Sequence, residues 1–399
     1  MDIFFQRKID RIAGTIICGI FSLFPINLIN TSKNIKSNKI LIILLSEMGS
    51  LVLARPMFDY IRKRYPYASV HVLLFKKNVE LMELLDIIPS NNILTVRDSS
   101  FMKFFKDSVN VVLRMRKIGI DTIIDCELFS RISSIYSFLS GAAIRAGFHP
   151  HTQEGLFRGS FINRPVLYNP YHHISKQFVN LVKAIESDLI PTVKCLIEEE
   201  TFPIPRLEIS RSELNEMQER LLADFPQIMD KKLVLIYPGG GLLPIRAWPL
   251  DYFNILADDL LENDYAIGII GMYSDAGLAD EIISHCQSRL CINLTGYTKS
   301  IKELMIMFQF SSLLIANDGG PGHFASMTPV PAIILYGPET PTLYGTLDEK
   351  DVNIYNPLSC SPCLTAYNHR NSPCDGDNIC LKLIHPKEVI RKAHKILGT

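Results

Sequence analysis

The sequence predicts an α/β protein of two Rossmann-like domains that face each other across a cleft. Two observations lead to this prediction. Short, continuous apolar runs alternate with longer helix-like stretches, and the alternation occurs twice, on either side of a proline-rich, acidic join at 198–205. Apolar runs of this length suit strands buried on both faces of a parallel sheet, with crossover helices between them. A chain of 399 residues is long enough for two such domains.

Residues 1–35 are expected to form a separate apolar segment followed by a polar linker. Arg7, Lys8 and Arg11 precede an apolar run over 12–24. That run is shorter than the roughly 20 residues of a membrane-spanning helix. We therefore expect a helix that lies on a membrane surface, held by apolar burial and by its basic flank. The alternative is a helix packed against the protein's own core.

The first Rossmann-like domain is expected over 36–205. It begins with a buried strand at 39–45, a turn at 46–50 and a helix over 51–64. The remaining elements continue the alternation. Strands are expected at 69–75, 92–96, 121–125 and 143–148, and helices at 101–117 and 130–140. This order is typical of successive βαβ units.

The second domain, expected over 206–399, repeats the pattern. Ser210 and Glu213 form a capping box at the start of a helix. Strands are expected at 233–237, 266–271, 313–316 and 332–336, and helices at 250–263, 274–286 and 301–310. Ligands of open parallel sheets bind at the carboxyl ends of the strands. The turns that follow the strands should therefore carry the chemistry.

The composition limits the partners and the redox compartment. Lys+Arg and Asp+Glu are both 41, so the net charge is zero. A nucleic-acid-binding protein normally carries a basic excess, and no nucleic-acid partner is expected. The nine cysteines are mostly scattered and odd in number. This argues against a disulfide framework and favours a reducing compartment.

The turn after the expected strand 313–316 gives the strongest local signal. It contains Asp318, Gly319 and Gly320, with His323 at the start of an apparent helix. Glycines let the backbone approach a ligand closely, and a helix start offers N–H groups to phosphate oxygens. His323 could also donate to a phosphate. The alternative is an ordinary glycine-rich turn with a capping aspartate.

A second glycine turn follows the expected strand 233–237. Gly239 and Gly240 lie in it, and Arg246 comes shortly after. Arg246 could supply the positive charge that a diphosphate leaving group requires. Trp248, the only tryptophan, is interpreted as a packing anchor. The sequence at 336–341, Tyr-Gly-Pro-Glu-Thr-Pro, indicates by itself only a rigid turn.

In combination these motifs resemble those of a known family. A glycine turn, Arg-x-Trp-Pro, Asp-x-Gly-x-x-His at 318–323 and Tyr-Gly-Pro-x-x-Pro occur in the order found in the donor half of the family 9 glycosyltransferases, the heptosyltransferases. The turn at 46–50 with Pro56 resembles that family's opening turn. The resemblance covers about 39–345. It implies the GT-B arrangement, with the acceptor bound by the first domain and the nucleotide-sugar by the second.

The resemblance also carries expectations about activity and partners. It implies inverting transfer of a sugar, with heptose as the first choice, and no metal at the donor. The donor would be ADP-heptose and the acceptor a lipid-linked or cell-envelope glycan, as in lipopolysaccharide biosynthesis. The enzyme would be cytoplasmic, peripheral on the inner membrane through residues 1–30.

Residue by residue, the resemblance places the donor ligands in the second domain. Arg246 stands where the family has a basic residue on the donor phosphates, and Asp318, Gly319, Gly320 and His323 form the phosphate and sugar turn. Asp275 falls near the acidic ribose ligand, although this match is loose. Ser274 is an alternative ribose ligand, and Asp275 could instead cap a helix.

One departure concerns the general base. The family's opening turn usually ends in an aspartate that is the proposed base, and Ser50 occupies that position here. A neutral serine is a poor base, because transfer requires a group that accepts the acceptor hydroxyl's proton. Glu47 on the same turn is the first candidate to replace it, and Asp125 and Glu127 after a neighbouring strand are others. The missing aspartate also allows a loss of activity.

Four cysteines gather near the end of the sequence: Cys360, Cys363, Cys374 and Cys380. Four thiolates can furnish a tetrahedral site, for which zinc is the default metal and iron an alternative. Relatives in this superfamily include proteins with a cysteine-bound metal after the donor domain. Because the second pair is spaced by five residues, free thiols or two disulfides remain alternatives. Any metal here would be structural.

Two rival functions remain open from the sequence. The first is a catalytically silent relative that binds nucleotide or glycan as an assembly factor, for which Ser50 is the main argument. The second is a sugar-nucleotide epimerase with a related two-domain fold. Consumption of donor only when acceptor is present would identify the transferase.

Overall fold

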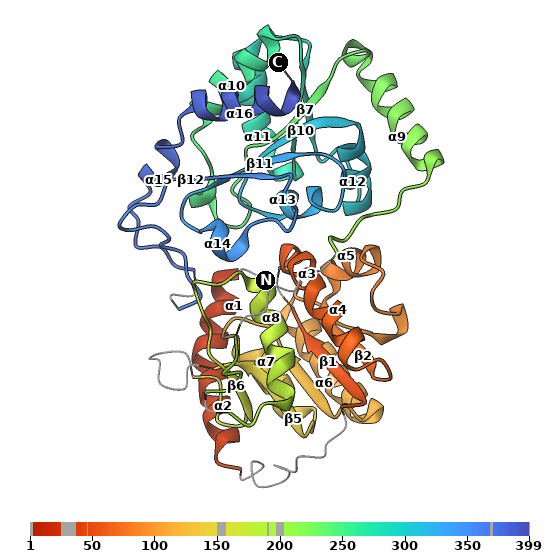
Figure 1. Ribbon diagram of the computed structural model, residues 1–399, viewed down its shortest axis with the longest axis vertical. Helices are drawn as coiled ribbons and strands as arrows, with labels where there is room; N and C mark the ends of the chain where they lie inside the picture. Colours follow the sequence, from red (N-terminus) through yellow and green to blue (C-terminus); the bar gives the residue numbers. More distant parts are fainter. Residues whose placement is uncertain are drawn as a thin grey trace. The chain divides into compact units, whose positions relative to one another are not determined.

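The computed structural model describes residues 3–24, 37–45, 47–149, 157–189, 191–196, 203–367 and 370–398. The expected linker around 30–36, Ser46 of the opening turn and most of the join at 198–205 lie outside these residues. The chain divides into two compact units, Met1–Pro203 and Ile204–Thr399. Each unit contains a six-stranded sheet covered by helices (Figure 1). The prediction of an α/β fold with two Rossmann-like domains is confirmed.

The sheet of unit 1 has the strand order β3-β2-β1-β4-β5-β6, and all its pairings are parallel. Its strands are β1 (Lys39–Ile43), β2 (Ser69–Phe75), β3 (Ile93–Val96), β4 (Thr122–Asp125), β5 (Ile144–Phe148) and β6 (Arg164–Val166). Four of the five residues of β1 are buried, as expected for a strand covered on both faces. The chain builds outward from β1 in one direction, then returns to place β4 on its other side.

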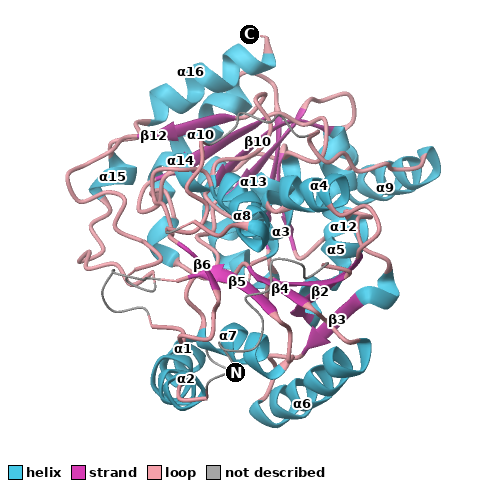
Figure 2. Cartoon of the chain, turned by 60° about the horizontal axis from the view of Figure 1, so that its bottom comes forward, coloured by secondary structure: helices cyan, strands magenta, loops and turns pink. Residues whose placement is uncertain are grey.

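Helices cover both faces of this sheet. They are α3 (Met48–Leu53), α4 (Arg55–Arg64), α5 (Val79–Leu84), α6 (Phe101–Ile118), α7 (Arg131–Leu139) and α8 (Ile174–Lys183), with α1 (Ile3–Ile9), η1 (Asp10–Gly14) and α2 (Thr15–Ser22) at the N-terminus. One layer holds α6, α7 and the three N-terminal segments, and α4 and α8 pack together on the opposite face (Figure 2). The single helix expected over 51–64 is interrupted at Ala54.

The N-terminal segments pack onto unit 1 by one side only. The Asp10 carboxylate accepts the backbone N–H groups of Arg131 and Ile132 at 2.8–3.1 Å and so caps the start of α7. Gly14 approaches so closely that an added Cβ would lie 2.6 Å from the Arg131 Cβ. Cys18 is fully buried, and Phe21 stacks on Phe138 with ring centroids 4.3 Å apart. One side of the segment is therefore packed against the protein's own core, as the alternative interpretation held. Its other side is exposed and apolar, so the membrane contact stays a prediction.

The sheet of unit 2 repeats the topology of the first, in the order β12-β11-β10-β7-β8-β9. Its strands, again all parallel, are β7 (Leu233–Tyr237), β8 (Ala266–Gly271), β9 (Cys291–Thr295), β10 (Ser311–Asn317), β11 (Ala332–Tyr336) and β12 (Val352–Tyr355). Its helices are α9 (Arg211–Asp224), α10 (Leu250–Glu262), α11 (Ala276–Cys286), α12 (Ile301–Phe310), α13 (Gly320–Ala325), α14 (Pro341–Tyr344), α15 (Ile379–Lys382) and α16 (Pro386–Leu397). The capping box of Ser210 and Glu213 opens α9 as predicted.

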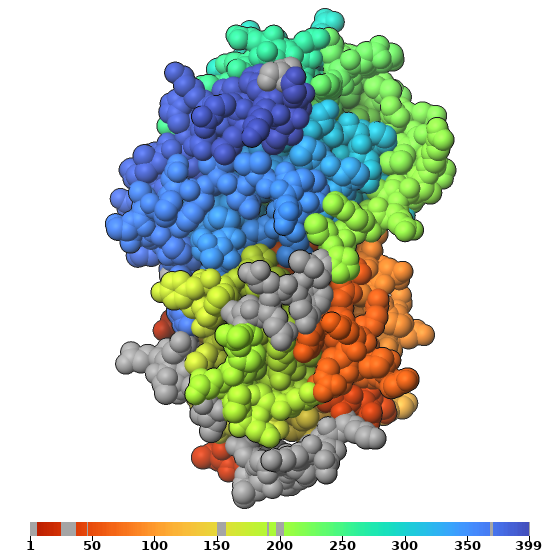
Figure 3. Space-filling view, in the orientation of Figure 1, coloured from red at the N-terminus to blue at the C-terminus, as the bar shows by residue number. Residues whose placement is uncertain are grey.

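The C-terminal helix α16 completes the core of unit 2. It packs against α10 and shares a hydrophobic cluster with Trp248. The Trp248 side chain is buried and its indole N–H donates to the Ile384 carbonyl at 2.9 Å, so this tryptophan is a packing anchor. In the space-filling view the dark blue C-terminal residues cover one surface of the unit (Figure 3). No helix in the described ranges is long and apolar enough to cross a membrane.

Candidate active site

The strand order of each sheet reverses at one position, and the predicted ligand turns of unit 2 lie there. In this sheet β10 pairs with β7, so the turn after β7 and the turn after β10 are neighbours at the carboxyl edge. Such a switch point is the usual ligand position of open α/β sheets. The topology therefore brings together Gly239, Gly240, Asp318 and Gly319, which are far apart in the sequence.

Asn317 fixes these two turns to each other. Its amide group donates to the carbonyls of Pro238 at 2.8 Å and Gly239 at 3.2 Å. Its Oδ1 accepts the backbone N–H of Trp248 at 3.0 Å. The side chain is fully buried, so each of these hydrogen bonds replaces one with water. The sequence did not identify Asn317 as a site residue, because its role depends on the pairing of β10 with β7.

Glycine is required in the first turn because the chain folds back tightly. A Cβ at Gly240 would lie 2.7 Å from the Leu243 carbonyl oxygen and 2.9 Å from the Pro244 Cα. Gly319 has an extended backbone, φ 170°, and is followed by α13, in which His323 is buried. A Cβ at Gly320 would lie 3.3 Å from the Phe324 ring. Gly240 is thus needed for backbone packing at this turn.

Charged side chains converge on Arg246. The Arg246 Nη2 donates to Glu339 Oε2 at 2.7 Å, and its Nε lies 3.6 Å from Asp318 Oδ2. On the other side, the Nε of Arg370 lies 3.4 Å from Glu339 Oε1. All four side chains are at most 14% exposed. Two arginines and two carboxylates thus form one cluster beside the glycine turns.

The electrostatics of this cluster are set mainly by burial. Burial raises the pKa of Glu339 to about 8; the Arg246 guanidinium opposes this shift and the Asp318 carboxylate adds to it. Burial likewise raises the pKa of Asp318, against the opposing charge of Arg246. A diphosphate brought beside Arg246 and Arg370 would satisfy cations that the two carboxylates now share. The sequence did not identify Glu339 or Arg370, which come from the turn after β11 and from the cysteine-containing segment.

Asp275 has a local partner. Its Oδ2 accepts the Met272 N–H at 2.8 Å, and the residue lies at the start of α11. The carboxylate nevertheless interacts with the Tyr237 side chain at the end of β7. Asp275 therefore closes the turn that precedes α11, without a side-chain hydrogen bond to the start of that helix, and lies at the same sheet edge as the glycine turns.

In unit 1, the proposed base lies at the start of α3. Glu47 is the N-terminal flanking residue of this helix, and Ser50 lies in its first turn, with its N–H bonded to the Glu47 carbonyl at 3.1 Å. Both residues are half-buried. β1 and β4 are paired, so this turn and the turn after Asp125 share the carboxyl edge of the sheet at its switch point.

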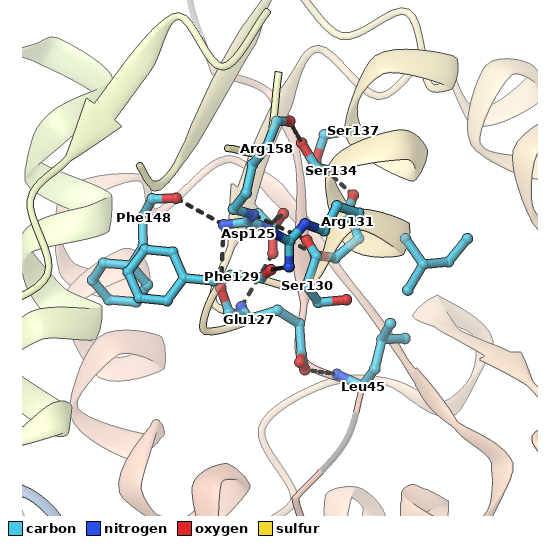
Figure 4. A network of polar contacts seen from close by, with 12 residues as sticks. Leu45, Asp125, Glu127, Phe129, Ser130, Arg131, Ser134, Ser137, Phe148 and Arg158 are labelled. Carbon is cyan, nitrogen blue, oxygen red and sulfur yellow. Dashed lines mark hydrogen bonds and ion pairs between the residues drawn. The ribbon is translucent and has the colours of Figure 1, made fainter. Parts of the chain in front are cut away.

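Asp125 occupies a different position from the one expected of a base. Its carboxylate is fully buried in an ion pair with the Arg158 guanidinium and also accepts the Glu127 N–H at 3.1 Å (Figure 4). Burial raises the pKa of Asp125, and the charge of Arg158 opposes this shift. A carboxylate enclosed in this way does not reach an acceptor hydroxyl. The structure therefore argues against Asp125 as the base and indicates that it holds the strand ends together.

Arg158 is the centre of this network. Its guanidinium donates to the carbonyls of Ser130, Glu127 and Phe148 at 2.9–3.2 Å (Figure 4). It also donates to the Ser133 hydroxyl at 2.8 Å. Glu127 is also largely buried, and its Oε1 accepts the Leu45 N–H at 2.6 Å. Glu127 thereby ties the end of β4 to the end of β1. Of the three carboxylates considered as the general base, Asp125 and Glu127 are buried and Glu47 is half-buried.

The cysteine-containing segment packs on the turn after β11. The N–H groups of Cys363 and Leu364 donate to the Pro338 carbonyl at 2.9 and 3.0 Å, directly beside Glu339. Cys360 and Cys374 are exposed, Cys363 is half-buried and Cys380 is buried in α15. In the described part of the chain, no three His, Cys, Asp or Glu side chains are arranged as a metal site. The metal at these four thiols stays a prediction.

Comparison with known proteins adds an independent line of information. The family model described as "Glycosyltransferase family 9 (heptosyltransferase)" matches residues 121–372. The lipooligosaccharide heptosyltransferase 2 of Haemophilus ducreyi is 23% identical over 323 residues, which are 79% of this chain and 88% of that protein. The lipopolysaccharide heptosyltransferase 2 of Salmonella typhimurium is 22% identical over 372 residues, covering 90% of this chain and 99% of the relative.

Solved structures share the fold. The E. coli ADP-heptose lps heptosyltransferase II matches with a TM-score of 0.68 and 19% identity, over 90% of this chain and 98% of that one. TibC, a dodecameric iron-containing heptosyltransferase solved with ADP-D-beta-D-heptose, matches with a TM-score of 0.54 and 13% identity, over 91% of this chain and 77% of that one. At these identities the likeness shows the fold alone.

Proposed function

The chain belongs to glycosyltransferase family 9, and from this premise we propose that it transfers heptose from ADP-heptose to a lipid-linked or cell-envelope glycan in lipopolysaccharide biosynthesis. The transfer inverts the anomeric centre and needs no metal at the donor. The relatives named for lipooligosaccharide and lipopolysaccharide heptosyltransferase support the acceptor class. The E. coli enzyme that is named for ADP-heptose and the structure of TibC in complex with ADP-D-beta-D-heptose support the donor.

One observation carries the proposal: Arg246 lies at the switch point of unit 2, between the glycine turns, within 2.7 Å of Glu339 and 3.6 Å of Asp318. When a diphosphate arrives, Arg246 and Arg370 bind its oxygens and stabilise the charge that develops as the nucleotide leaves. Asp318, His323 and the backbone of Gly319 and Gly320 orient the sugar and the phosphates. Asp275 remains the proposed ribose ligand, on the edge formed by β8.

The acceptor hydroxyl must lose its proton as it attacks the anomeric carbon. Glu47 is the proposed base, because it follows β1 at the switch point of unit 1 and is more exposed than Asp125 and Glu127. Ser50, one turn further along α3, lies where it can orient the same hydroxyl but does not take up its proton.

Incubation of the purified protein with ADP-heptose and heptose-deficient lipopolysaccharide tests the proposal. Release of ADP that depends on acceptor, together with a heptosylated product, is expected. ADP-heptose that binds but is never consumed would instead identify a silent relative. Isomerisation of the donor without acceptor would identify an epimerase.

We also propose that Cys360, Cys363, Cys374 and Cys380 hold one structural zinc or iron ion. Burial raises the pKa of the Cys380 thiol, and Cys363 and Cys374 add to this shift. TibC, which shares the fold, is described as iron-containing. Elemental analysis of protein purified without added metal should find close to one ion per chain. Metal-free protein with four alkylatable thiols would contradict the proposal.

A third proposal concerns residues 1–30 as a contact with the cytoplasmic face of the inner membrane. Ile12, Ile16 and Ile20 recur at four-residue spacing and are 51–59% exposed on the side away from α7. Asp10 and Cys18 belong to the packing of unit 1, so deletion of the segment would uncover its core. Substitution of Ile16 and Ile20 by serine is the cleaner test. The share of this variant in the membrane fraction should fall relative to wild type, and a wild-type protein already soluble without detergent would contradict the proposal.

A further inference from the structure

A second apolar surface of unit 1 lies on α6, in the same helical layer as the N-terminal segments. Met102, Phe105, Val109 and Leu113 recur at intervals of three and four residues, so they line one side of the helix. These side chains are 45–74% exposed, and Phe101 at the start of the helix is also exposed. Isolated apolar residues are normal on protein surfaces, whereas a contiguous row on one helix marks an interaction site.

The exposure is not caused by poor docking of the helix. The opposite side of α6 carries Val111 and Met115, which are buried in the core of unit 1. Ser108 is hydrogen-bonded to Tyr136 of α7 at 2.6 Å. Ser100 caps the N-terminus and Gly119, with φ 75°, ends the helix. α6 is therefore firmly packed on one side and apolar on another.

The charges around the apolar row favour one kind of partner. α6 carries five exposed basic residues: Lys103, Lys106, Arg114, Arg116 and Lys117. Its one acidic residue, Asp107, is neutralised by two hydrogen bonds from Arg97 at 2.7 and 2.8 Å. The whole chain is neutral, with 41 basic and 41 acidic residues, so this excess is local. Apolar side chains flanked by basic ones are the pattern of helices that lie in the interface of an anionic bilayer.

The position of α6 agrees with this pattern. α6, α7 and α2 lie in one layer on the same face of the sheet (Figure 2). Tyr136 of α7 is hydrogen-bonded to α6, and Phe138 of α7 stacks on Phe21 of α2. The N-terminal segments also carry exposed apolar residues and the basic Lys8 and Arg11, while their Asp10 is used to cap α7. Two apolar and basic helices thus border one face of unit 1.

We propose that α6 is a second membrane contact, which inserts Met102, Phe105, Val109 and Leu113 into the headgroup region of an anionic phospholipid bilayer. Its lysines Lys103, Lys106 and Lys117 bind the lipid phosphates, whereas Arg114 and Arg116 also donate hydrogen bonds to backbone carbonyls of unit 1. The partner is the bilayer itself, and α6 acts together with the N-terminal segments. The α6 residues lie in unit 1 and the donor ligands in unit 2, so the α6 variants should bind ADP with wild-type affinity.

Flotation of the full chain with phosphatidylcholine vesicles, with and without phosphatidylglycerol, tests the proposal. Wild-type protein should bind the anionic vesicles more strongly than the neutral ones. Phe105→Ser with Leu113→Ser should weaken that binding by about tenfold or more, since each side chain loses most of its apolar surface. Lys103→Gln with Lys106→Gln should reduce binding to anionic vesicles by roughly fivefold per charge and leave neutral vesicles unaffected.

Matched controls separate this contact from other effects. Asn110→Ser changes an exposed residue of α6 outside the apolar row, and Ile255→Ser removes an exposed aliphatic side chain from unit 2. Both should bind as wild type, and all variants should keep their melting temperature because the altered side chains are exposed. Ile16→Ser with Ile20→Ser in the N-terminal segment should leave residual binding that the α6 substitutions remove.

Three outcomes would overturn the proposal. The first is unchanged vesicle binding by the Phe105 and Leu113 double variant. The second is that the N-terminal variant loses all vesicle binding while the α6 variant binds vesicles as wild type does. The third is wild-type protein that forms a dimer, dissolved by the α6 substitutions, without binding vesicles; the row would then be an interface between two copies. In each of these cases ADP binding should be unchanged, because the donor ligands lie in unit 2 and α6 lies in unit 1.

Discussion

Arg246 is the residue on which the donor site depends most directly. Replacement by alanine removes a charge-assisted contact to phosphate, and ADP affinity should fall by roughly tenfold to over a hundredfold, or about 1.5–3 kcal/mol. Arg246→Lys should recover part of the affinity, because the charge remains but the planar fork is lost. Titration calorimetry with ADP measures both. Arg220→Ala on α9, which breaks an ion pair with Glu303 of α12, is the control and should bind ADP normally. If wild type, Arg246→Ala and Arg246→Lys bind ADP with equal affinity, Arg246 does not belong to the site.

At Glu47 the expected effect is on turnover alone. Loss of a general base typically costs about 10²–10⁴ in rate, so Glu47→Gln should lower turnover by that range with ADP affinity unchanged. Ser50→Asp, which restores the family's usual residue, should raise turnover or rescue the Glu47 variant. Steady-state kinetics with saturating donor measure the effect. Full turnover in Glu47→Gln, with loss in Glu127→Gln, would move the base to the end of β4.

At the scale of elements, Asn317 joins β7 to β10 beyond the sheet hydrogen bonds. Asn317→Ala leaves the Pro238 and Gly239 carbonyls buried without this donor, and each such loss costs about 1–3 kcal/mol. Urea unfolding should show that the free energy of unfolding decreases by this amount. ADP should also bind more weakly, because the glycine turn is held less firmly. Asn263→Ala, which removes one exposed side-chain hydrogen bond to the Asp259 carbonyl, should change stability by no more than about 0.5 kcal/mol. Unchanged unfolding of Asn317→Ala would show that the turns hold without it.

Two glycines of the N-terminal segments offer a matched pair. Gly14→Ala places a Cβ 2.6 Å from the Arg131 Cβ and should destabilise unit 1 by about 1–3 kcal/mol. Gly19→Ala meets nothing within 4 Å and should stabilise the helix by roughly 0.5–1 kcal/mol. Thermal unfolding compares the two variants. If both are stabilised, the segment is not docked on α7 in solution.

The elements that the sequence predicted are those with the simplest physical signal. β7 reads as a continuous apolar run because all five residues are buried, whereas the three-residue β6 contains Arg164 and was not predicted. In the site, the glycine turns and Arg246 were recognisable from local patterns. Glu339 was not, because it meets Arg246 only through the pairing of β10 with β11, 93 residues along the chain. The enclosure of Asp125 likewise depends on Arg158, 33 residues away.

For the whole molecule, the carboxyl cluster predicts a dependence of stability on pH. A carboxyl whose pKa is higher in the folded chain favours folding while protonated. The contribution of Glu339 to the free energy of unfolding is therefore fully present below pH 4.5, the ordinary pKa of a glutamate, and is lost as the pH rises to about 8. Each pKa unit of difference corresponds to about 1.4 kcal/mol. Melting temperatures of wild type and Glu339→Gln across this range should converge or cross, with wild type losing more stability. Parallel curves would mean that Glu339 does not titrate there.

The docking of the N-terminal segments on α7 also sets an order of events during synthesis. Asp10 cannot form its hydrogen bond to Arg131 until the ribosome has added 121 further residues. The hydrogen bond between Ser22 and Ser160 requires 138 further residues. At a translation rate of about 5–20 residues per second, these gaps last roughly 6–28 seconds. During that time the helix has emerged and neither of its apolar sides has an intramolecular partner. Each nascent chain therefore presents an apolar, basic helix to its surroundings well before the domain that will receive it has been made.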